Sequence, residues 1–188
     1  MRTTAVGQSA LLLLDAVDVL AREGIKYAVI GAMAASIHGI VRASFDADAV
    51  LSLVSSRARD VERMFSGAGF NTELRIGDLE DPIPALLQLT DKFGNRVDLL
   101  VGLRGLDAEA FARALDVPFQ GASLRVIGQE DFVAMKAFAA GPQDLADATN
   151  AVAIAGGSLD IDLVTRLAKR YGRDAIKNLE TILAGAQK

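Results

Sequence analysis

The chain has 188 residues, of which 51% are hydrophobic and 23% charged, enough for the core of one domain or of one domain with a small helical addition. It has no cysteine and one histidine, which excludes a disulfide scaffold, a thiol nucleophile and a metal site built from several histidines. The net charge of -4 and the pI near 5.0 argue against a broad nucleic-acid-binding surface. The first apolar run ends at Asp15, so we expect no secretory signal, no membrane partner and a cytoplasmic location.

The first two thirds of the chain mix helical and strand patterns. Apolar residues at helical spacing predict a first helix over Ser9–Glu23, with Ser9 as its N-cap. Strands are expected at Lys26–Ile30, Phe45–Val54, Asn71–Ile76, Ala85–Thr90, Arg96–Val101, Val117–Gln120 and Ser123–Ile127. Further helices are expected at Ala32–His38, Arg57–Ser66 and Asp107–Leu115, and a polar loop at Gly77–Pro84.

After Gly128 the pattern becomes helical throughout. Four helices are expected, at Glu130–Ala140, Gln143–Ala155, Ile161–Arg170 and Asp174–Leu183. The sequence therefore predicts an α+β fold, with a mixed sheet flanked by helices and a C-terminal helical bundle. We expect residues 1–128 to form the α/β core and residues 129–188 to form a helical region packed on that core.

An acid pair stands in the second predicted strand. Side chains alternate between the two faces of a strand, so Asp46 and Asp48 share one face, about 6.5 Å apart along the strand. Their neighbours Phe45, Ala47 and Ala49 are expected to point into the core. Two carboxylates on one face repel each other. They are tolerated either on a solvated face or around a divalent cation, and this pattern alone leaves both readings open.

A third acid lies inside the apolar strand Arg96–Val101. Asp98 is costly there unless it is paired or metal-bound. If this strand lies beside the first acidic one, Asp98 joins Asp46 and Asp48. Three carboxylates from two adjacent strands form a hard-oxygen site suited to Mg²⁺, with Mn²⁺ as the other candidate. Such a site can hold two ions for in-line transfer from a triphosphate.

A glycine turn precedes the acid pair. Gly31 ends the short strand before it and leads directly into the next predicted helix. The backbone N–H groups at such a turn are free to bind phosphate, and glycine lets the main chain approach closely. The turn at Gly31 and Ala32 is therefore a candidate phosphate site.

These motifs together resemble the DNA polymerase beta-like nucleotidyltransferase superfamily. The resemblance rests on Ile30-Gly31-Ala32-x-Ala34, His38-Gly39, Arg42-x-Ser44, Asp46-x-Asp48 and the later Asp98. Within the superfamily the pattern is similar to the minimal bacterial subgroup related to AbiEii-type toxins. It covers Tyr27 to Val101 and extends weakly to Glu130-Asp131, Lys136, Asp144 and Asp147.

The resemblance implies a metal-dependent transfer of a nucleoside monophosphate from an NTP to a hydroxyl. Asp46, Asp48 and Asp98 would be the catalytic and metal-binding residues, and Gly31 and Ala32 would hold the β and γ phosphates. The acceptor stays open between a tRNA end, a protein side chain and a small molecule, and a toxin would have a cognate antitoxin. Ala32 departs from the usual Ser or Gly, which favours a second reading: a catalytically degraded module that binds a nucleotide or partner.

Other nucleotide-binding candidates flank this core. The resemblance adds Arg42, Ser44, which stands where Thr is common, and Lys136. The alternative for Arg42 is a carboxylate partner, and for Lys136 a solvated or snorkelling side chain. Asp144 and Asp147, one helical turn apart, are expected to anchor their helix or pair with a basic residue.

Two further features could have either a structural or a functional role. His38 stands at a predicted helix end, where it either packs structurally or contacts nucleotide. The basic cluster Lys169, Arg170, Arg173 and Lys177 is either a solvated helix face or a surface for a polyanionic acceptor such as RNA.

Overall fold

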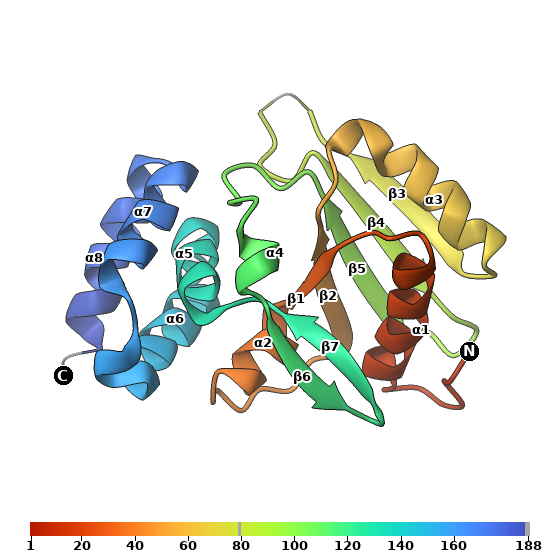
Figure 1. Ribbon diagram of the computed structural model, residues 1–188, viewed down its shortest axis with the longest axis horizontal. Coiled ribbons are helices and arrows are strands. Elements are labelled where there is room, and N and C mark those ends of the chain that lie inside the picture. Colours follow the sequence, from red (N-terminus) through yellow and green to blue (C-terminus); the bar gives the residue numbers. More distant parts are fainter. Residues whose placement is uncertain (79, 187–188) are drawn as a thin grey trace. The chain divides into compact units, whose positions relative to one another are not determined.

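The computed structural model describes residues 1–78 and 80–186, and the chain forms two compact units. The first unit contains residues 1–33, 43–104 and 115–126. The second contains residues 34–42 and 105–114 together with the chain from Ile127 onward. The first unit carries the sheet and the second carries the C-terminal helices (Figure 1).

The first unit is built on a seven-stranded mixed sheet with the order β3-β4-β5-β2-β1-β7-β6. The strands are β1 (Tyr27–Ile30), β2 (Asp46–Leu51), β3 (Asn71–Ile76), β4 (Ala85–Thr90), β5 (Arg96–Val101), β6 (Leu115–Phe119) and β7 (Ala122–Val126). Strand β2 runs parallel to β5 and antiparallel to β1. Strands β4 and β5 have the bounds that the sequence predicts, and the expected mixed sheet is confirmed.

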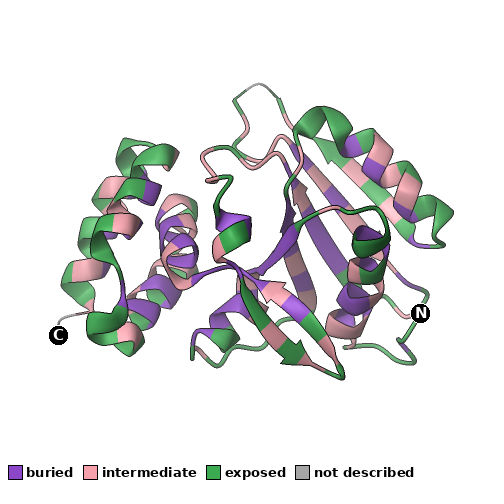
Figure 2. Cartoon of the chain, in the orientation of Figure 1, coloured by how far each residue is buried: buried purple, intermediate pink, exposed green. Residues whose placement is uncertain are grey.

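Helices α1 (Ser9–Arg22) and α3 (Ala58–Gly67) pack on one face of this sheet, and a short 3-10 turn (Ser55–Arg57) precedes α3. Leu12 of α1, Phe65 of α3 and Leu99 of β5 are fully buried in the resulting core. Burying one such side chain stabilises the fold by about 1.5–3 kcal/mol. The central strands are accordingly buried along most of their length (Figure 2).

Strand alternation makes the opposite face of the sheet polar. Along β4, fully buried residues alternate with partly exposed ones. Gln88 of this strand pairs in register with Asp98 of β5, and Asp98 pairs with Asp48 of β2. Residues that pair directly across adjacent strands point to the same face, so these three polar side chains form a row across the sheet.

The second unit is a helical bundle around α5 (Gln129–Ala139), which packs against the three helices that follow it. These are α6 (Pro142–Ala155), α7 (Ile161–Tyr171) and α8 (Arg173–Gly185), and a 3-10 turn (Gly156–Ser158) follows α6. Phe132, Val133 and Ala137 of α5 are buried in its core. The expected C-terminal helical bundle is confirmed.

Two short helices differ in their bounds from the predicted helices. Helix α2 (Gly31–Ile37) follows β1 without a linker, one residue earlier than expected. The helix predicted over Asp107–Leu115 shortens to α4 (Ala110–Arg113), because a turn capped by the Asp107 carboxylate precedes it and β6 begins at Leu115. In the predicted loop Gly77–Pro84, residue 79 lies outside the described residues. Among the described helices, none has the length and apolar character needed to cross a bilayer.

Candidate active site

Strands β2 and β5 bring the three predicted acids together. Their parallel register places Asp46 opposite Arg96 and Asp48 opposite Asp98. One carboxylate oxygen from each of Asp46, Asp48 and Asp98 lies within 4.8 Å of the other two. The predicted convergence of these carboxylates is therefore confirmed, and we call the three residues the acid triad.

Asp98 is the most enclosed member of the triad. Its exposure is 7%, whereas Asp46 and Asp48 are partly exposed. A buried carboxylate needs hydrogen-bond donors to offset the loss of water. Gln88 Nε2 donates to Asp98 Oδ1 at 3.2 Å from the neighbouring strand β4. The remaining donors come from a residue to which the sequence analysis assigned no role.

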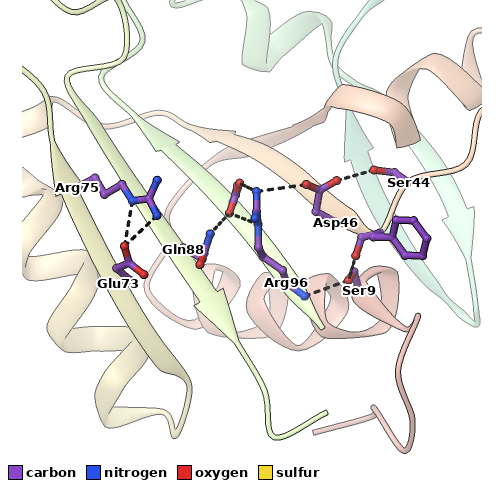
Figure 3. Close-up of polar contacts among 9 residues, drawn as sticks. Ser9, Ser44, Asp46, Glu73, Arg75, Gln88 and Arg96 are labelled. Carbon is purple, nitrogen blue, oxygen red and sulfur yellow. Dashed lines mark hydrogen bonds and ion pairs between the residues drawn. The ribbon is translucent and has the colours of Figure 1, made fainter. Parts of the chain in front are cut away.

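That residue is Arg96, whose guanidinium spans two of the three acids (Figure 3). Its Nη2 donates to Asp98 Oδ2 at 2.7 Å and to Asp46 Oδ2 at 3.3 Å, and its Nε donates to Asp98 Oδ1 at 3.1 Å. The hydrogen bonds to Asp98 raise the pKa of Arg96 above its usual value, against the effect of burial. The spacing Arg96-x-Asp98 was the available signal, since residues two apart on a strand share a face.

Two serines organise the start of the acidic strands. Ser44 Oγ donates a short hydrogen bond to Asp46 Oδ1. Ser9 Oγ donates to the Phe45 carbonyl at 2.6 Å and accepts from the Arg96 N–H at 3.0 Å, so it ties the start of β2 to the start of β5. The predicted capping role of Ser9 is wrong: Gln8 is at the N-cap, and the Ser9 hydroxyl is used between the strands.

The predicted core position of Phe45 is wrong. Phe45 was expected to point into the core, yet 91% of its surface is exposed. Strand β2 begins one residue later, at Asp46, so the alternation of faces does not extend to Phe45. The predicted core positions of Ala47 and Ala49 are confirmed, since both are buried.

Gly31 lies directly against the acid triad, where a residue with a side chain would not fit. It adopts a φ of +64°, a conformation that side chains other than glycine rarely take. A Cβ added to Gly31 would lie 2.0 Å from Asp48 Oδ2, because Ile30 is the register partner of Asp48. Ala32 follows directly and is buried. The structure thus brings the glycine turn against one acid of the triad.

Arg42 and Lys136 lie in the second unit, where both pair with carboxylates. Lys136 Nζ is 2.6 Å from Asp144 Oδ1 and 3.0 Å from Asp147 Oδ2, and Arg42 Nη1 is 2.9 Å from Asp147 Oδ2. Burial raises the pKa of the Asp147 carboxyl, but hydrogen bonds from Gln143 and Lys136 outweigh it and lower the pKa. The expected pairing of Asp144 and Asp147 with basic residues is confirmed. The contact of Arg42 and Lys136 with nucleotide stays a prediction.

His38 also lies in the second unit and packs in its interior. Its Nε2 donates to the Ile127 carbonyl at 2.9 Å, and its ring lies 5.1 Å from the Phe132 ring. Burial lowers the pKa of His38, although the hydrogen bond and the charge of Glu130 act to raise it. The structure therefore confirms the packing role, one of the two roles that the sequence left open for His38.

The basic cluster does not act as one free surface. Arg170 Nε donates to the Gly105 carbonyl at 3.0 Å, which ties α7 to the segment before α4. Lys169, Arg173 and Lys177 are exposed. An RNA contact at these residues stays a prediction.

The acid triad fits a hard divalent cation. Mg²⁺ takes oxygen ligands at about 2.0–2.1 Å, so two oxygens on one ion stand at most about 4.2 Å apart. The triad oxygens lie within 4.8 Å of one another, close to that spacing. The triad contains oxygen donors alone, which favours Mg²⁺ or Mn²⁺ over softer metals.

Comparison with known proteins identifies the fold. No family model matches the sequence, and no curated protein matches it. The structure is similar to that of ANT(2'')-Ia in complex with adenylyl-2''-tobramycin, with a TM-score of 0.62 and 13% identity over 86% of this chain and 98% of that one. It is also similar to the lincosamide antibiotic adenylyltransferase LnuA in its lincomycin-bound form, with a TM-score of 0.50 and 11% identity over 81% and 99% of the two chains.

A third similar structure is an antigenic nucleotidyltransferase-like protein from Paracoccidioides brasiliensis, with a TM-score of 0.52 and 12% identity over 98% and 95% of the two chains. These likenesses, at low identity, show the fold. The chain has the nucleotidyltransferase fold, in agreement with the resemblance seen in the sequence. The AbiEii-type subgroup stays a prediction.

Proposed function

We propose that the protein is a divalent-metal-dependent nucleotidyltransferase that transfers a nucleoside monophosphate from an NTP to an acceptor hydroxyl. One observation carries the proposal: within a nucleotidyltransferase fold, three carboxylates converge from adjacent strands beside a glycine turn. A lone acid cluster is common on protein surfaces. In this cluster Asp98 is 7% exposed, and Asp48 packs against Gly31, which has a positive φ. These two features distinguish the acid triad from an exposed group of surface acids.

The proposed roles follow from position. Asp46, Asp48 and Asp98 would hold Mg²⁺, in one or two ions, or Mn²⁺. When bound, the metal supplies positive charge to the triphosphate and to the attacking oxygen. Gly31 and Ala32 would receive the β and γ phosphates, because a turn without a side chain at Gly31 lets phosphate approach the main chain.

The reaction would form a bond between the acceptor oxygen and the α phosphorus and break the bond from that phosphorus to the β-phosphate oxygen. Pyrophosphate leaves, and the hydroxyl proton passes to a base. We assign that base to Asp98, the triad member on the neighbouring strand. Both Asp98 oxygens accept hydrogen bonds from Arg96 or Gln88, so one of them must be released for the transfer.

A small hydroxylated molecule is the acceptor that we propose to test first. Two structures with this fold carry such molecules, an adenylylated tobramycin and lincomycin. RNA ends and protein side chains are the other acceptor classes. A toxin role with a cognate antitoxin rests on the sequence resemblance and stays a prediction, as do the nucleotide contacts of Arg42, Ser44 and Lys136.

Ala32 favours a second candidate, a binding module that has lost catalysis. A methyl group stands where the superfamily commonly has a serine hydroxyl or no side chain, so Ala32 lacks the phosphate contact that a serine hydroxyl would make. Such a module would bind NTP and Mg²⁺ without turnover. The two candidates therefore differ in whether a labelled product forms.

The test is transfer of label from [α-³²P]NTPs, each supplied with Mg²⁺ or with EDTA. The acceptors are aminoglycosides, lincosamides, total small RNA and the protein itself. The proposal expects one labelled acceptor with Mg²⁺, no label with EDTA, and no label with Asp48→Asn. The matched control is Glu73→Gln, because Glu73 lies on the same sheet face but outside the triad and pairs with Arg75. Binding of NTP without label on any acceptor would support the binding module instead.

A further inference from the structure

We propose that Arg96 is the internal counter-ion of the acid triad. Its guanidinium takes the place of the divalent cation in the metal-free protein, and metal binding displaces it from Asp98 and Asp46. Arg96 thereby sets the affinity of the site for metal. This inference rests on the proposed function, because it needs the triad to be a metal site.

The guanidinium of Arg96 is matched to the carboxylate of Asp98. A guanidinium offers a planar fork of donors that matches a carboxylate, and Arg96 uses it fully on Asp98, at 2.7 and 3.1 Å. The same Nη2 then reaches Asp46 at 3.3 Å. One cationic group therefore serves two of the three acids that would ligate the metal.

The acid triad needs a positive charge among its carboxylates. Carboxylates within 4.8 Å of one another repel strongly unless a positive charge lies among them. Arg96 supplies such a charge, and it is the charged group that hydrogen-bonds to Asp98 in the described part of the chain. Arg96 and a metal ion would compete for the same carboxylate oxygens, since Asp98 has both oxygens occupied by Arg96.

The difference in exposure between Asp98 and Arg96 decides which of the two side chains moves. The Asp98 side chain is 10% exposed, whereas the Arg96 side chain is 44% exposed. The main chain of Arg96 is fixed in β5 and by Ser9 Oγ, so only its long side chain is free to turn toward solvent. A metal ion can thus replace the guanidinium without disturbing the strand.

The chain offers a matched control in Arg75. Arg75 of β3 lies on the same sheet face as Arg96, by the register of β3, β4 and β5, and it is 63% exposed. It pairs with Glu73 at 3.0 Å and has no described contact with the triad. Arg75→Gln and Arg96→Gln remove the same charge from the same face, but only Arg96→Gln removes the counter-ion.

The first measurement is Mg²⁺ binding by calorimetry, with melting temperatures in EDTA and in Mg²⁺. Arg96→Gln should bind Mg²⁺ at least tenfold more tightly than wild type, melt lower in EDTA and recover in Mg²⁺. Arg75→Gln should stay within about twofold of wild type. Equal affinities in wild type and Arg96→Gln, with binding abolished by Asp48→Asn, would overturn the role of Arg96 and leave the metal site standing. No binding by either protein would overturn both proposals.

The second measurement distinguishes displacement of the Arg96 guanidinium from a change in the electrostatic field at the metal site. The Nε–H resonance of Arg96, assigned by its loss in Arg96→Gln, reports whether the guanidinium is held. It should be protected from solvent exchange in EDTA and lose that protection at saturating Mg²⁺, while the Arg75 resonance stays unchanged. Retained protection of Arg96 at saturating Mg²⁺ would overturn the proposal.

Discussion

Gly31 and Asp48 are built against each other: a Cβ at Gly31 would lie 2.0 Å from Asp48 Oδ2 and 2.9 Å from its Cγ. Gly31, the first residue of the proposed phosphate turn, therefore packs directly against Asp48, a proposed metal ligand. The positive φ of Gly31 adds a second reason for glycine at this position. The glycine turn and the acid triad are thus in direct contact, and we expect a change at Gly31 to alter metal binding through Asp48.

Gly31→Ala tests this coupling. The added methyl group must push the Asp48 carboxylate aside, so Mg²⁺ binding should weaken at least tenfold, with a loss of stability of roughly 1–3 kcal/mol from the strained φ. The control is Gly24→Ala, which has the same φ of +64° and nothing within 4 Å of the new Cβ. It should lose stability in the lower part of that range and bind Mg²⁺ normally. Calorimetry and urea unfolding give both values, and weakened Mg²⁺ binding in both variants would refute the coupling.

Asp98→Asn should separate chemistry from folding. The amide keeps the size of the side chain but cannot accept a proton as a base, so label transfer should fall by roughly a hundredfold or more. Removing one of three close carboxylates would stabilise the protein if no positive charge offset their repulsion. Here Arg96 already offsets the repulsion, so we expect a net loss of about 1 kcal/mol from weaker hydrogen bonds. Transfer at the wild-type rate would show that Asp98 is not the base.

Lys136→Met should destabilise the second unit. Asp147 is fully buried and would keep Arg42 and Gln143 as partners but lose Lys136. Breaking a buried ion pair from one side costs about 3–5 kcal/mol, and we expect the lower end because Arg42 remains. The control is Lys177→Met, an exposed lysine of the same unit, which should change stability by less than about 0.5 kcal/mol. Equal urea midpoints for the two variants would contradict the assignment.

His38 predicts how stability depends on pH. It is the one histidine of the chain, and burial lowers its pKa in the folded state below the usual 6.5. Above about pH 6.5 the imidazole is neutral in both states. Below it the unfolded chain binds the proton first, so the free energy of unfolding falls as the pH falls, by at most about 1.4 kcal/mol per pH unit.

Urea unfolding between pH 7 and pH 5.5 measures this slope. His38→Gln places an amide near the position of Nε2, which keeps a donor toward the Ile127 carbonyl. This variant should show a flat profile over the same window. An unchanged slope in His38→Gln would assign the pH dependence to other groups.

The acid triad could be predicted because its signals are local. Alternation along one strand places Asp46 and Asp48 on one face, and Asp98 stands out as a charge in an apolar strand. The strands Ala85–Thr90 and Arg96–Val101 were predicted with their observed bounds, and the register that joins β5 to β2 then completed the site.

The features that the sequence analysis missed depend on contacts between distant residues. Ser9 bonds to residues 36 and 87 positions away, so a local reading as a helix cap was the natural one and was wrong. Phe45 is exposed because β2 starts after it, and strand ends are poorly defined by pattern. Arg96 needed the register between β2 and β5 before its reach to Asp46 could be seen.

The most direct test of the central claim is a crystal structure of the protein with Mn²⁺ and a non-hydrolysable NTP, with the metal located by its anomalous scattering. Mn²⁺ serves as the probe because it takes the same oxygen ligands as Mg²⁺. We expect an anomalous peak from an ion ligated by Asp46, Asp48 and Asp98, with the triphosphate against the main chain of Gly31 and Ala32. A nucleotide bound elsewhere, or an acid triad without metal at saturating Mn²⁺, would contradict this expectation.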